Sequence, residues 1–209
     1  GSVPVEKIIS ILAGVKKAKI KETFPYAKVA RCMPNTPCSI GCGAVAVDAE
    51  DFDEADRQFI LRLFSALGTA LALSEDKMDA VTGISGSGPA YVYLFIKGLV
   101  EAGIRHGLTE EQAKTLAVNT VIGSGKMVLE NADKTLDMLI DAVCSKGGTT
   151  IEAVKTFREN NFIGIIGEAV DACVSRSIEL GGGKVEKKKS AHDAGSVTIY
   201  TDGACSGNP

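Results

Sequence analysis

A glycine-rich turn at residues 144–152 carries the residue types best suited to binding an anion. It reads Cys-Ser-Lys-Gly-Gly-Thr-Thr-Ile-Glu, and a helical pattern follows at once. The N-terminus of a helix favours an anion because free backbone N–H groups and the positive end of the helix dipole meet there. Gly147 and Gly148 let a ligand approach the backbone, since neither has a Cβ. The turn predicts a site for a small carboxylate, with the hydroxyls of Ser145 and Thr150 as directional donors or acceptors.

A second interpretation of this turn stays open. Thr149 and Glu152 have the spacing of a capping box, which predicts a helix start fixed by side chains. A capped loop-to-helix turn that binds no ligand has the same sequence.

The bulk composition excludes several classes of partner. The 209 residues include 23 basic and 26 acidic side chains, a net charge of −3, which indicates neither a nucleic-acid nor a membrane-surface partner. No apolar run reaches the roughly 18 residues of a membrane span, and no signal-peptide pattern is visible, so we expect a cytoplasmic protein. Six cysteines without a CxxC pair, beside only two histidines, predict reduced thiols and no metal site.

Two structural parts are needed to position such a turn, and the first covers residues 1–75. Short apolar runs alternate there with helical patterns, as in an α/β sheet. An amphipathic helix is expected over residues 53–67, with Asp53 as its cap and Gly68 as its stop. Strands are predicted at residues 7–13, 28–33, 43–47 and 69–73.

The second part, residues 76–181, has helical patterns only. Pro89 suits a first helical position, and Thr109 with Gln112 has capping-box spacing. Further helices are predicted over residues 109–129, 136–143, 151–158 and 162–180. Because these helices are so apolar, we expect them to need a partner surface. Residues 182–195 are glycine- and lysine-rich and predict a linker, and residues 196–209 begin with another strand pattern.

Four motifs in register resemble the pyrroline-5-carboxylate reductase family over residues 3–181. They are Ala13-Gly14, the run from Arg31 to Pro37 (Arg-Cys-Met-Pro-Asn-Thr-Pro), the run from Asp79 to Tyr91 (Asp-Ala-Val-Thr-Gly-Ile-Ser-Gly-Ser-Gly-Pro-Ala-Tyr), and the Gly-Gly-Thr-Thr turn. The resemblance implies an α/β then all-α chain, with a partial Rossmann-type nucleotide-binding domain followed by a helical dimerisation domain. It also implies an enzyme that reduces 1-pyrroline-5-carboxylate to L-proline with NADPH or NADH, as a homodimer or a ring of dimers.

The resemblance assigns a cofactor side to the site. It places Ala13 and Gly14 along the nicotinamide, and makes Met33, Pro34 and Asn35 the strand-end loop between nicotinamide and substrate. Without the resemblance, Asn35 reads equally well as a turn residue.

The resemblance also assigns a substrate side. The substrate carboxylate would be held by Ser145, Gly147, Gly148, Thr149 and Thr150. Thr150 would reach the ring nitrogen and is the candidate catalytic residue. Imine reduction needs a hydride on carbon and a proton on nitrogen. The cofactor supplies the hydride, so the protein has to orient the substrate and polarise its C=N bond.

Three features depart from the family pattern. The family often has proline at the position of Lys146, and two cysteines, Cys38 and Cys42, stand in an unexpected loop. No G-x-G-x-x-G phosphate loop is present, so about half of the nucleotide-binding domain is expected to be missing and the chain itself could be inactive.

The tail from Val197 to Pro209 resembles the opening strand of a type 1 ribonuclease H. The resemblance makes Asp202 equivalent to a magnesium-binding carboxylate. Two-metal cleavage needs several converging carboxylates, so Asp202 would bind metal only if a complete domain followed. Two alternatives to a reductase therefore remain: an oligomerisation module without catalysis, and the carrier part of a ribonuclease H fusion.

Overall fold

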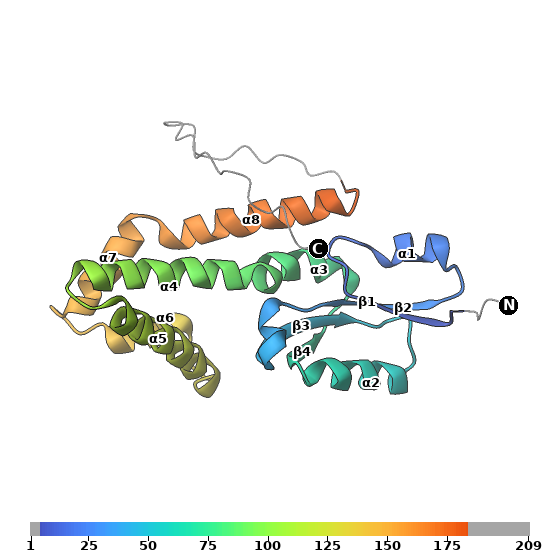
Figure 1. Cartoon of the computed structure of the whole chain (residues 1–209), viewed down its shortest axis with the longest axis horizontal. Helices are drawn as coiled ribbons and strands as arrows, with labels where there is room; N and C mark the ends of the chain where they lie inside the picture. The colour runs from blue at the N-terminus through green and yellow to red at the C-terminus, as the bar shows by residue number, and fades with distance from the viewer. Residues whose placement is uncertain (1–4, 184–209) are drawn as a thin grey trace.

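The computed structural model describes residues 5–183, which form a small sheet and a long helical extension (Figure 1). The predicted linker beyond residue 183 and the ribonuclease H-like tail lie outside the described residues. The sheet has the order β1-β2-β3-β4. Its strands are β1 (Lys7–Ser10), β2 (Lys28–Met33), β3 (Gly43–Asp48) and β4 (Gly68–Ala72).

The sheet is mixed, which the sequence patterns did not predict. β1 runs parallel to β2, and β3 runs parallel to β4, but β2 and β3 are antiparallel. Helix α1 (Lys17–Thr23) connects β1 to β2, and the 3-10 helix η1 (Thr36–Ile40) connects β2 to β3. Helix α2 (Glu54–Ser65) connects β3 to β4 and covers the opposite face of the sheet from α1 (Figure 1).

The central strands β2 and β3 are buried on both faces, because successive side chains point to opposite sides. One face forms the main apolar core against α2. That core comprises Ala30, Cys32, Val45, Val47, Ala49, Phe52, Ile60 and Phe64.

The other face holds a network of buried charges. Both carboxylate oxygens of Asp48 lie 2.9 Å from Nζ of Lys17, and Glu50 N donates to Asp48 Oδ1 at 3.0 Å. Arg31, which is 3% exposed, lies 3.4 Å from Glu75, and Glu75 also accepts from Lys17 N. The network ties α1, β2 and β3 to the segment that leads into the helical part.

The helical part begins directly after β4. It contains η2 (Glu75–Lys77), α3 (Met78–Val81), the π-helical segment η3 (Thr82–Gly86), α4 (Gly88–Arg105), α5 (Glu110–Glu130), α6 (Leu136–Val143), α7 (Thr149–Glu159) and α8 (Phe162–Leu180).

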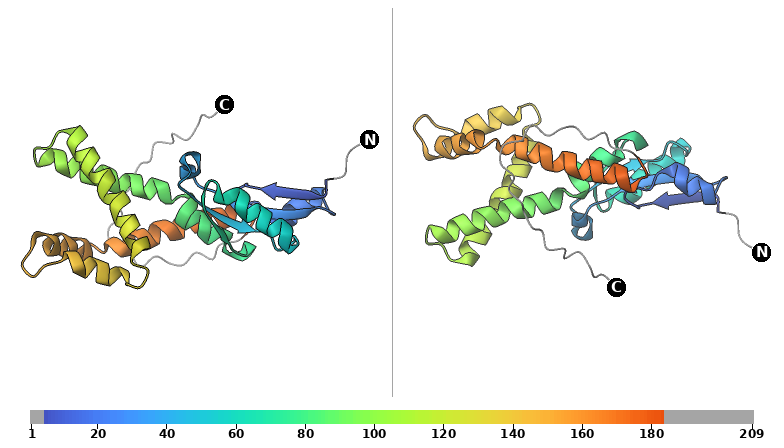
Figure 2. Two further views of the ribbon diagram at one scale, coloured as in Figure 1. Left: turned by 90° about the horizontal axis from the view of Figure 1, so that it is seen from below. Right: turned by 90° about the horizontal axis from the view of Figure 1, so that it is seen from above.

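 The bounds of α6 and α8 agree with the predicted helices, and α7 spans Thr149–Glu159, one to two residues beyond its predicted ends. From above and below, this part divides into two arms, one with the end of α4 and the other with α6 and α7, and α5 runs from the first arm towards the second (Figure 2).

Two predicted helix caps are confirmed. The Asp53 side chain accepts from Asp56 N at the start of α2. Thr109 and Gln112 form the full capping box of α5, with bonds of 3.2 and 2.9 Å. At both helix starts, the side-chain oxygen of the N-cap residue is the acceptor, and no glycine competes for the N-cap position.

Three element boundaries were wrong. The first strand stops at Ser10 rather than residue 13, because the chain turns at Gly14 with φ +74°. Helix α2 stops at Ser65, and Gly68 is the first residue of β4 rather than the helix stop. Helix α4 begins at Gly88, so Pro89 is its second residue.

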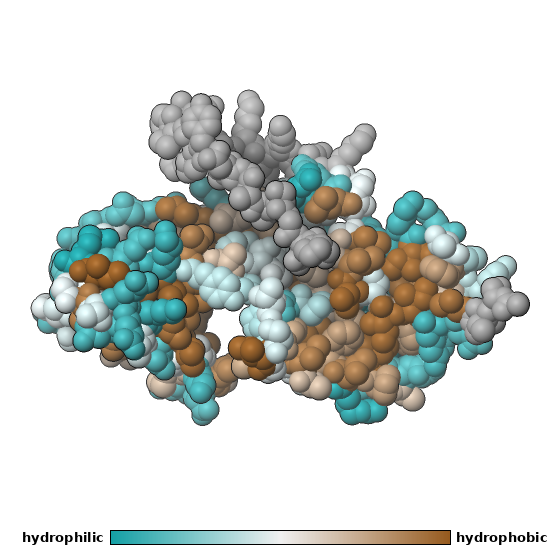
Figure 3. All heavy atoms as spheres, in the orientation of Figure 1, coloured by the Kyte–Doolittle hydropathy of each residue, from teal (hydrophilic) through white to brown (hydrophobic). Residues whose placement is uncertain are grey.

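Large apolar side chains stay exposed along the helical part, as its sequence predicted. The space-filling view shows apolar patches over both the helices and the sheet (Figure 3). More than half of the residue's surface is exposed in Tyr93, Leu94, Leu116, Met127, Leu129, Leu136, Val143, Ile163 and Ile165. Within residues 5–183, no helix is both long and apolar enough to cross a membrane.

Candidate active site

The predicted cofactor residues follow two neighbouring parallel strands. β1 and β2 pair with Ser10 opposite Arg31, so their carboxyl ends meet at one edge of the sheet. Ala13 and Gly14 follow β1, and Met33 to Asn35 end β2 and begin the next loop. Ligands of open α/β sheets bind at such edges, so the structure brings the two predicted cofactor segments to a suitable place.

Helix α8 ends against the first of these segments. A Cβ on Gly14 would lie 3.2 Å from Leu180 Cβ, and a Cβ on Gly181 would lie 2.8 Å from the Gly14 carbonyl oxygen. Gly14 is therefore buried under the end of α8, whereas Ala13 is exposed. A positive φ and this close contact both explain why glycine stands at position 14.

The second segment contacts the π-helical segment η3. A Cβ on Gly86 would lie 2.8 Å from Met33 Cε, so the methionine side chain rests directly on that glycine. Asn35 Nδ2 donates to the Ser85 carbonyl at 3.1 Å, and Asn35 Oδ1 accepts from Ala44 N at 3.0 Å. Both ends of the Asn35 amide are thus used within the protein.

A pocket of about 400 Å³ lies beside this loop. Asn35 and Pro37 line it from the loop, and Ser85, Pro89 and Tyr91 line it from η3 and α4. Burial raises the pKa of Tyr91, and the neighbouring Cys173 thiol adds to the rise, so this hydroxyl stays protonated at neutral pH. A mostly apolar pocket of this size with a few polar groups has the general character of a small-molecule site.

The predicted substrate turn has a defined backbone geometry. Gly148 N donates to the Ser145 carbonyl at 2.9 Å, and Gly147 has φ +74°. Since Lys146 has a negative φ, this is a type II turn with glycine at its third position. Proline suits the second position of such a turn, which explains physically why it is a family alternative to Lys146.

The predicted Thr149–Glu152 capping box is wrong. Gly148 is the N-cap of α7, in an extended conformation, and no side chain caps the helix. Thr149 is already the first helical residue, so its hydroxyl cannot take the N-cap position. The first N–H groups of α7 are therefore left without a side-chain acceptor in the described part of the chain, and a Cβ on Gly148 would lie 2.2 Å from Ser145 Oγ.

The two halves of the predicted site do not meet within one chain. The strand-end loop lies at the sheet, and the turn before α7 lies at the remote end of the helical part (Figures 1 and 2). Helix α7 packs instead against the start of α8, where the rings of Phe157 and Phe162 are 4.8 Å apart.

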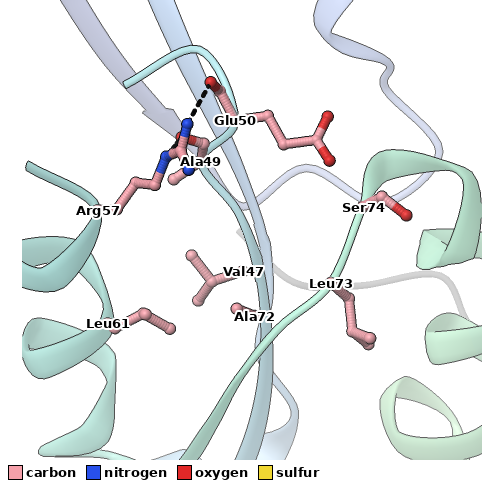
Figure 4. A pocket seen from close by; sticks show the side chains of 8 residues that line it. All are labelled: Val47, Ala49, Glu50, Arg57, Leu61, Ala72, Leu73 and Ser74. Carbon is pink, nitrogen blue, oxygen red and sulfur yellow. Dashed lines mark hydrogen bonds between the residues drawn. The ribbon is translucent and has the colours of Figure 1, made fainter. Parts of the chain in front are cut away.

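A second pocket, of about 210 Å³, lies between α2 and the end of β4 (Figure 4). Its one cation, Arg57, donates to the carbonyl oxygens of Ala49, Glu50 and Phe52 at 2.9–3.2 Å. The guanidinium therefore binds the backbone of the loop between β3 and α2. None of the predicted site residues lines this pocket.

Neither the buried Cys32 thiol nor a cluster of metal ligands adds other chemistry in the described part of the chain. Burial, with the nearby charge of Asp48, raises the pKa of Cys32 to about 12, so it is no nucleophile at neutral pH. Within residues 5–183, no three potential ligands gather into a metal site, and Asp202 lies outside the described residues.

Comparison with known proteins decides the family. The family model described as "Pyrroline-5-carboxylate reductase dimerisation" matches residues 75–180. A pyrroline-5-carboxylate reductase of Synechocystis is 42% identical over 175 residues, which cover 83% of this chain and 65% of the relative. The chain belongs to the pyrroline-5-carboxylate reductase family.

Other members of the pyrroline-5-carboxylate reductase family agree with this assignment. The Escherichia coli enzyme is 37% identical over 178 residues, covering 83% of this chain and 65% of its own length. The Plasmodium falciparum enzyme, solved with NADP bound, is 35% identical with a TM-score of 0.78, covering 83% of this chain and 70% of that one. The Coxiella burnetii enzyme is 34% identical with a TM-score of 0.79, covering 86% and 66%. The chain spans about 65% of the length of the curated relatives it matches.

Sequence reasoning missed the residues of η3 and α8 that complete the surroundings of the loop. Ser85 and Gly86 were noted only as part of a family motif, and Leu180 only as the end of a helix. The proline at position 89 was the available signal, because a proline inside a helical run frees the carbonyl four residues earlier.

Proposed function

We propose that this chain is part of an enzyme that reduces 1-pyrroline-5-carboxylate to L-proline with NADPH or NADH. Family membership supports the reaction, and the NADP bound to the Plasmodium falciparum relative supports a nicotinamide cofactor. Two local features of the chain carry the proposal. One is the strand-end loop beside a ring-sized pocket, and the other is the turn before α7, where the first helix N–H groups have no side-chain acceptor. The cytoplasmic location expected from the sequence belongs to the same proposal.

The proposed site is shared between two copies of the chain. The loop and the turn lie at opposite ends of one chain, so a second copy must bring its turn to the first copy's loop. The exposed apolar side chains of α4 to α8 supply a surface for this pairing. We expect the chain to sediment with at least twice the mass of one copy, and a monomer at micromolar concentration would contradict the shared site.

Each residue of the turn has a proposed role toward the substrate carboxylate. The first N–H groups of α7, at Thr149 and Thr150, attract the carboxylate to the positive helix end. Ser145 adds a hydroxyl donor, and Gly147 and Gly148 allow the close approach. With its carboxylate held here, the substrate has one fixed orientation toward the loop.

The remaining roles concern the reacting bond. A bound reduced nicotinamide supplies the hydride that adds to the imine carbon. The Thr150 hydroxyl donates a hydrogen bond to the ring nitrogen or relays a proton to it, and so favours the nitrogen's gain of a proton. Ala13, Gly14, Met33, Pro34 and Asn35 form the wall that fixes the plane of the ring.

Substitution of Thr150 by valine tests this assignment. Valine keeps the side-chain volume and loses the hydroxyl, so we expect kcat to fall roughly 10- to 100-fold, as for a lost hydrogen bond to a charged group. Thr156→Val is the matched control, because the Thr156 hydroxyl donates to the Glu152 carbonyl within the same helix. Equal turnover of the parent and the Thr150→Val variant, in a preparation that is active, would contradict the role of Thr150.

A further inference from the structure

Pro89 interrupts the hydrogen bonding of an almost continuous helical run from Met78 to Arg105. Proline has no N–H, and its ring crowds the carbonyl four residues earlier, which here belongs to Ser85. The backbone responds with the π-helical segment η3, closed by a bond of 2.9 Å from Ser87 N to the Thr82 carbonyl. The first N–H after Pro89, that of Ala90, donates to the Ser87 carbonyl at 3.0 Å. The donor that an uninterrupted α-helix would offer the Ser85 carbonyl, the N–H four residues later, is therefore missing.

Asn35 supplies the missing donor from 50 residues away in the sequence. Its Nδ2 donates to the Ser85 carbonyl at 3.1 Å, while its Oδ1 accepts from Ala44 N at 3.0 Å. An asparagine side chain has a donor end and an acceptor end, and this geometry uses both. One half-buried amide therefore joins the loop after β2 to β3 on one side and to the helical part on the other.

The same junction fixes the neighbouring residue of the loop. Met33 Cε lies 2.8 Å from where a Cβ on Gly86 would be, so Met33 and Asn35 contact consecutive residues of η3. A change in η3 would shift both side chains together.

We propose that Asn35 is a positioning residue, which holds the strand-end loop against the helical part by capturing the carbonyl that Pro89 leaves free. Besides lining the pocket, its side chain acts on the site through the placement of Met33 and Pro34. The consequence for hydride transfer rests on the proposed function, whereas the junction itself does not.

The test is amide hydrogen exchange, followed by NMR, in the 209-residue chain and in Asn35→Ala, Pro89→Ala and the double variant. Loss of Asn35 removes the acceptor of Ala44 N–H, so its exchange should become about fivefold faster, the factor that corresponds to a net hydrogen bond of about 1 kcal/mol. Alanine at position 89 restores an N–H that competes for the Ser85 carbonyl. An Asn35 side chain released from Ser85 is no longer held in place and bonds Ala44 N–H more weakly, so in that background Asn35→Ala should accelerate Ala44 exchange by less than about twofold.

Two controls separate this junction from general loosening. Asn119→Ala removes an exposed side-chain donor to the Thr115 carbonyl, and Pro25→Ala removes an exposed proline in a turn. Neither should change Ala44 exchange. The same acceleration by Asn35→Ala in both backgrounds would overturn the proposal, since a residue with only a general stabilising role would act alike in each.

A measurement on the unmodified chain covers the case in which a variant does not fold. One Nδ2 proton of Asn35 should exchange about fivefold more slowly than a solvated side-chain amide, because it is bonded to Ser85. Exchange at the solvated rate would overturn the proposal. All of these readings are independent of turnover, so a failure of the proposed reaction and a failure of the Asn35 junction give different results.

Discussion

Replacing Asp48 by asparagine should destabilise the sheet strongly, because it removes the central negative charge of a buried network. The Asp48 side chain is fully buried, and both of its oxygens lie 2.9 Å from Lys17 Nζ. The Lys17 side chain is 12% exposed and that of Arg31 is 4% exposed, so neither cation can turn to water. Asparagine has nearly the same shape and can still accept from Glu50 N, so the substitution changes charge more than packing.

The size of the loss follows from what remains around the cations. Breaking a buried ion pair by removing one partner costs about 3–5 kcal/mol. Asp51 lies 3.7 Å from Lys17 Nζ, and Glu75 contacts Arg31, so part of the countercharge survives. We therefore expect a loss near the lower end, about 3 kcal/mol in the free energy of unfolding. For a chain of this length, that corresponds to a fall in Tm of roughly 10 °C.

Urea denaturation at pH 7, followed by circular dichroism, measures this loss directly. Asp53→Asn is the matched control, because asparagine is an equally good N-cap and the Asp53–Lys28 pair is exposed, so we expect less than about 0.5 kcal/mol. If Asp48→Asn is as mild as Asp53→Asn, the network on the α1 face does not stabilise the fold, and our account of how α1 is held is wrong.

Two further substitutions test the sheet. Gly68→Ala should lower the free energy of unfolding by roughly 3 kcal/mol or more in urea denaturation, since Gly68 has φ +140° and the new Cβ would lie 2.1 Å from the Gly43 carbonyl oxygen. The control is Gly107→Ala, where φ is +91° but nothing lies within 4 Å, and we expect a loss of about 1 kcal/mol. Asp51→Asn should reduce the acid sensitivity of the fold. Burial raises the pKa of Asp51, but hydrogen bonds from Lys21 and from Val29 N–H outweigh it and hold that pKa below 3.8. The carboxylate therefore stabilises the fold above about pH 4, and this contribution is lost as the pH falls through the lower pKa of the folded state. Unfolding free energies measured between pH 6 and pH 3 should fall less steeply in Asp51→Asn than in the parent, and parallel curves would refute this.

The helices could be predicted from the sequence because their signals are local. The apolar period of 3.6 residues fixed the bounds of α6 and α8, and the Thr109–Gln112 pair marked the start of α5. The cap of α7 failed for an equally local reason, since Gly148 adopts the extended N-cap conformation one residue before Thr149.

The pairing of the strands could not be predicted in the same way. The apolar runs of β2 and β3 show that both strands are buried, but not that they are antiparallel. Their direction is set by η1, whose short turn between Asn35 and Gly41 reverses the chain. Likewise, no local pattern links Asn35 to Ser85, because that contact depends on the whole path from β2 to η3.

The two segments of the candidate site could be predicted from the sequence, but their position relative to each other could not. Glycines and hydroxyl residues indicated the turn before α7, whereas only the family resemblance indicated the loop at Met33. Their separation within one chain follows from the length of α4 and α8, and it makes a second copy part of the proposal.

The most direct test is 1-pyrroline-5-carboxylate-dependent oxidation of NADPH, followed at 340 nm. It compares this chain with a longer chain that adds a glycine-rich strand–turn–helix upstream, each with and without Thr150→Val. Our account predicts oxidation by at least the longer chain, dependent on the substrate and reduced at least roughly 10-fold by Thr150→Val. Absence of oxidation in both chains would contradict the reductase proposal and leave an oligomerisation role for the helical part.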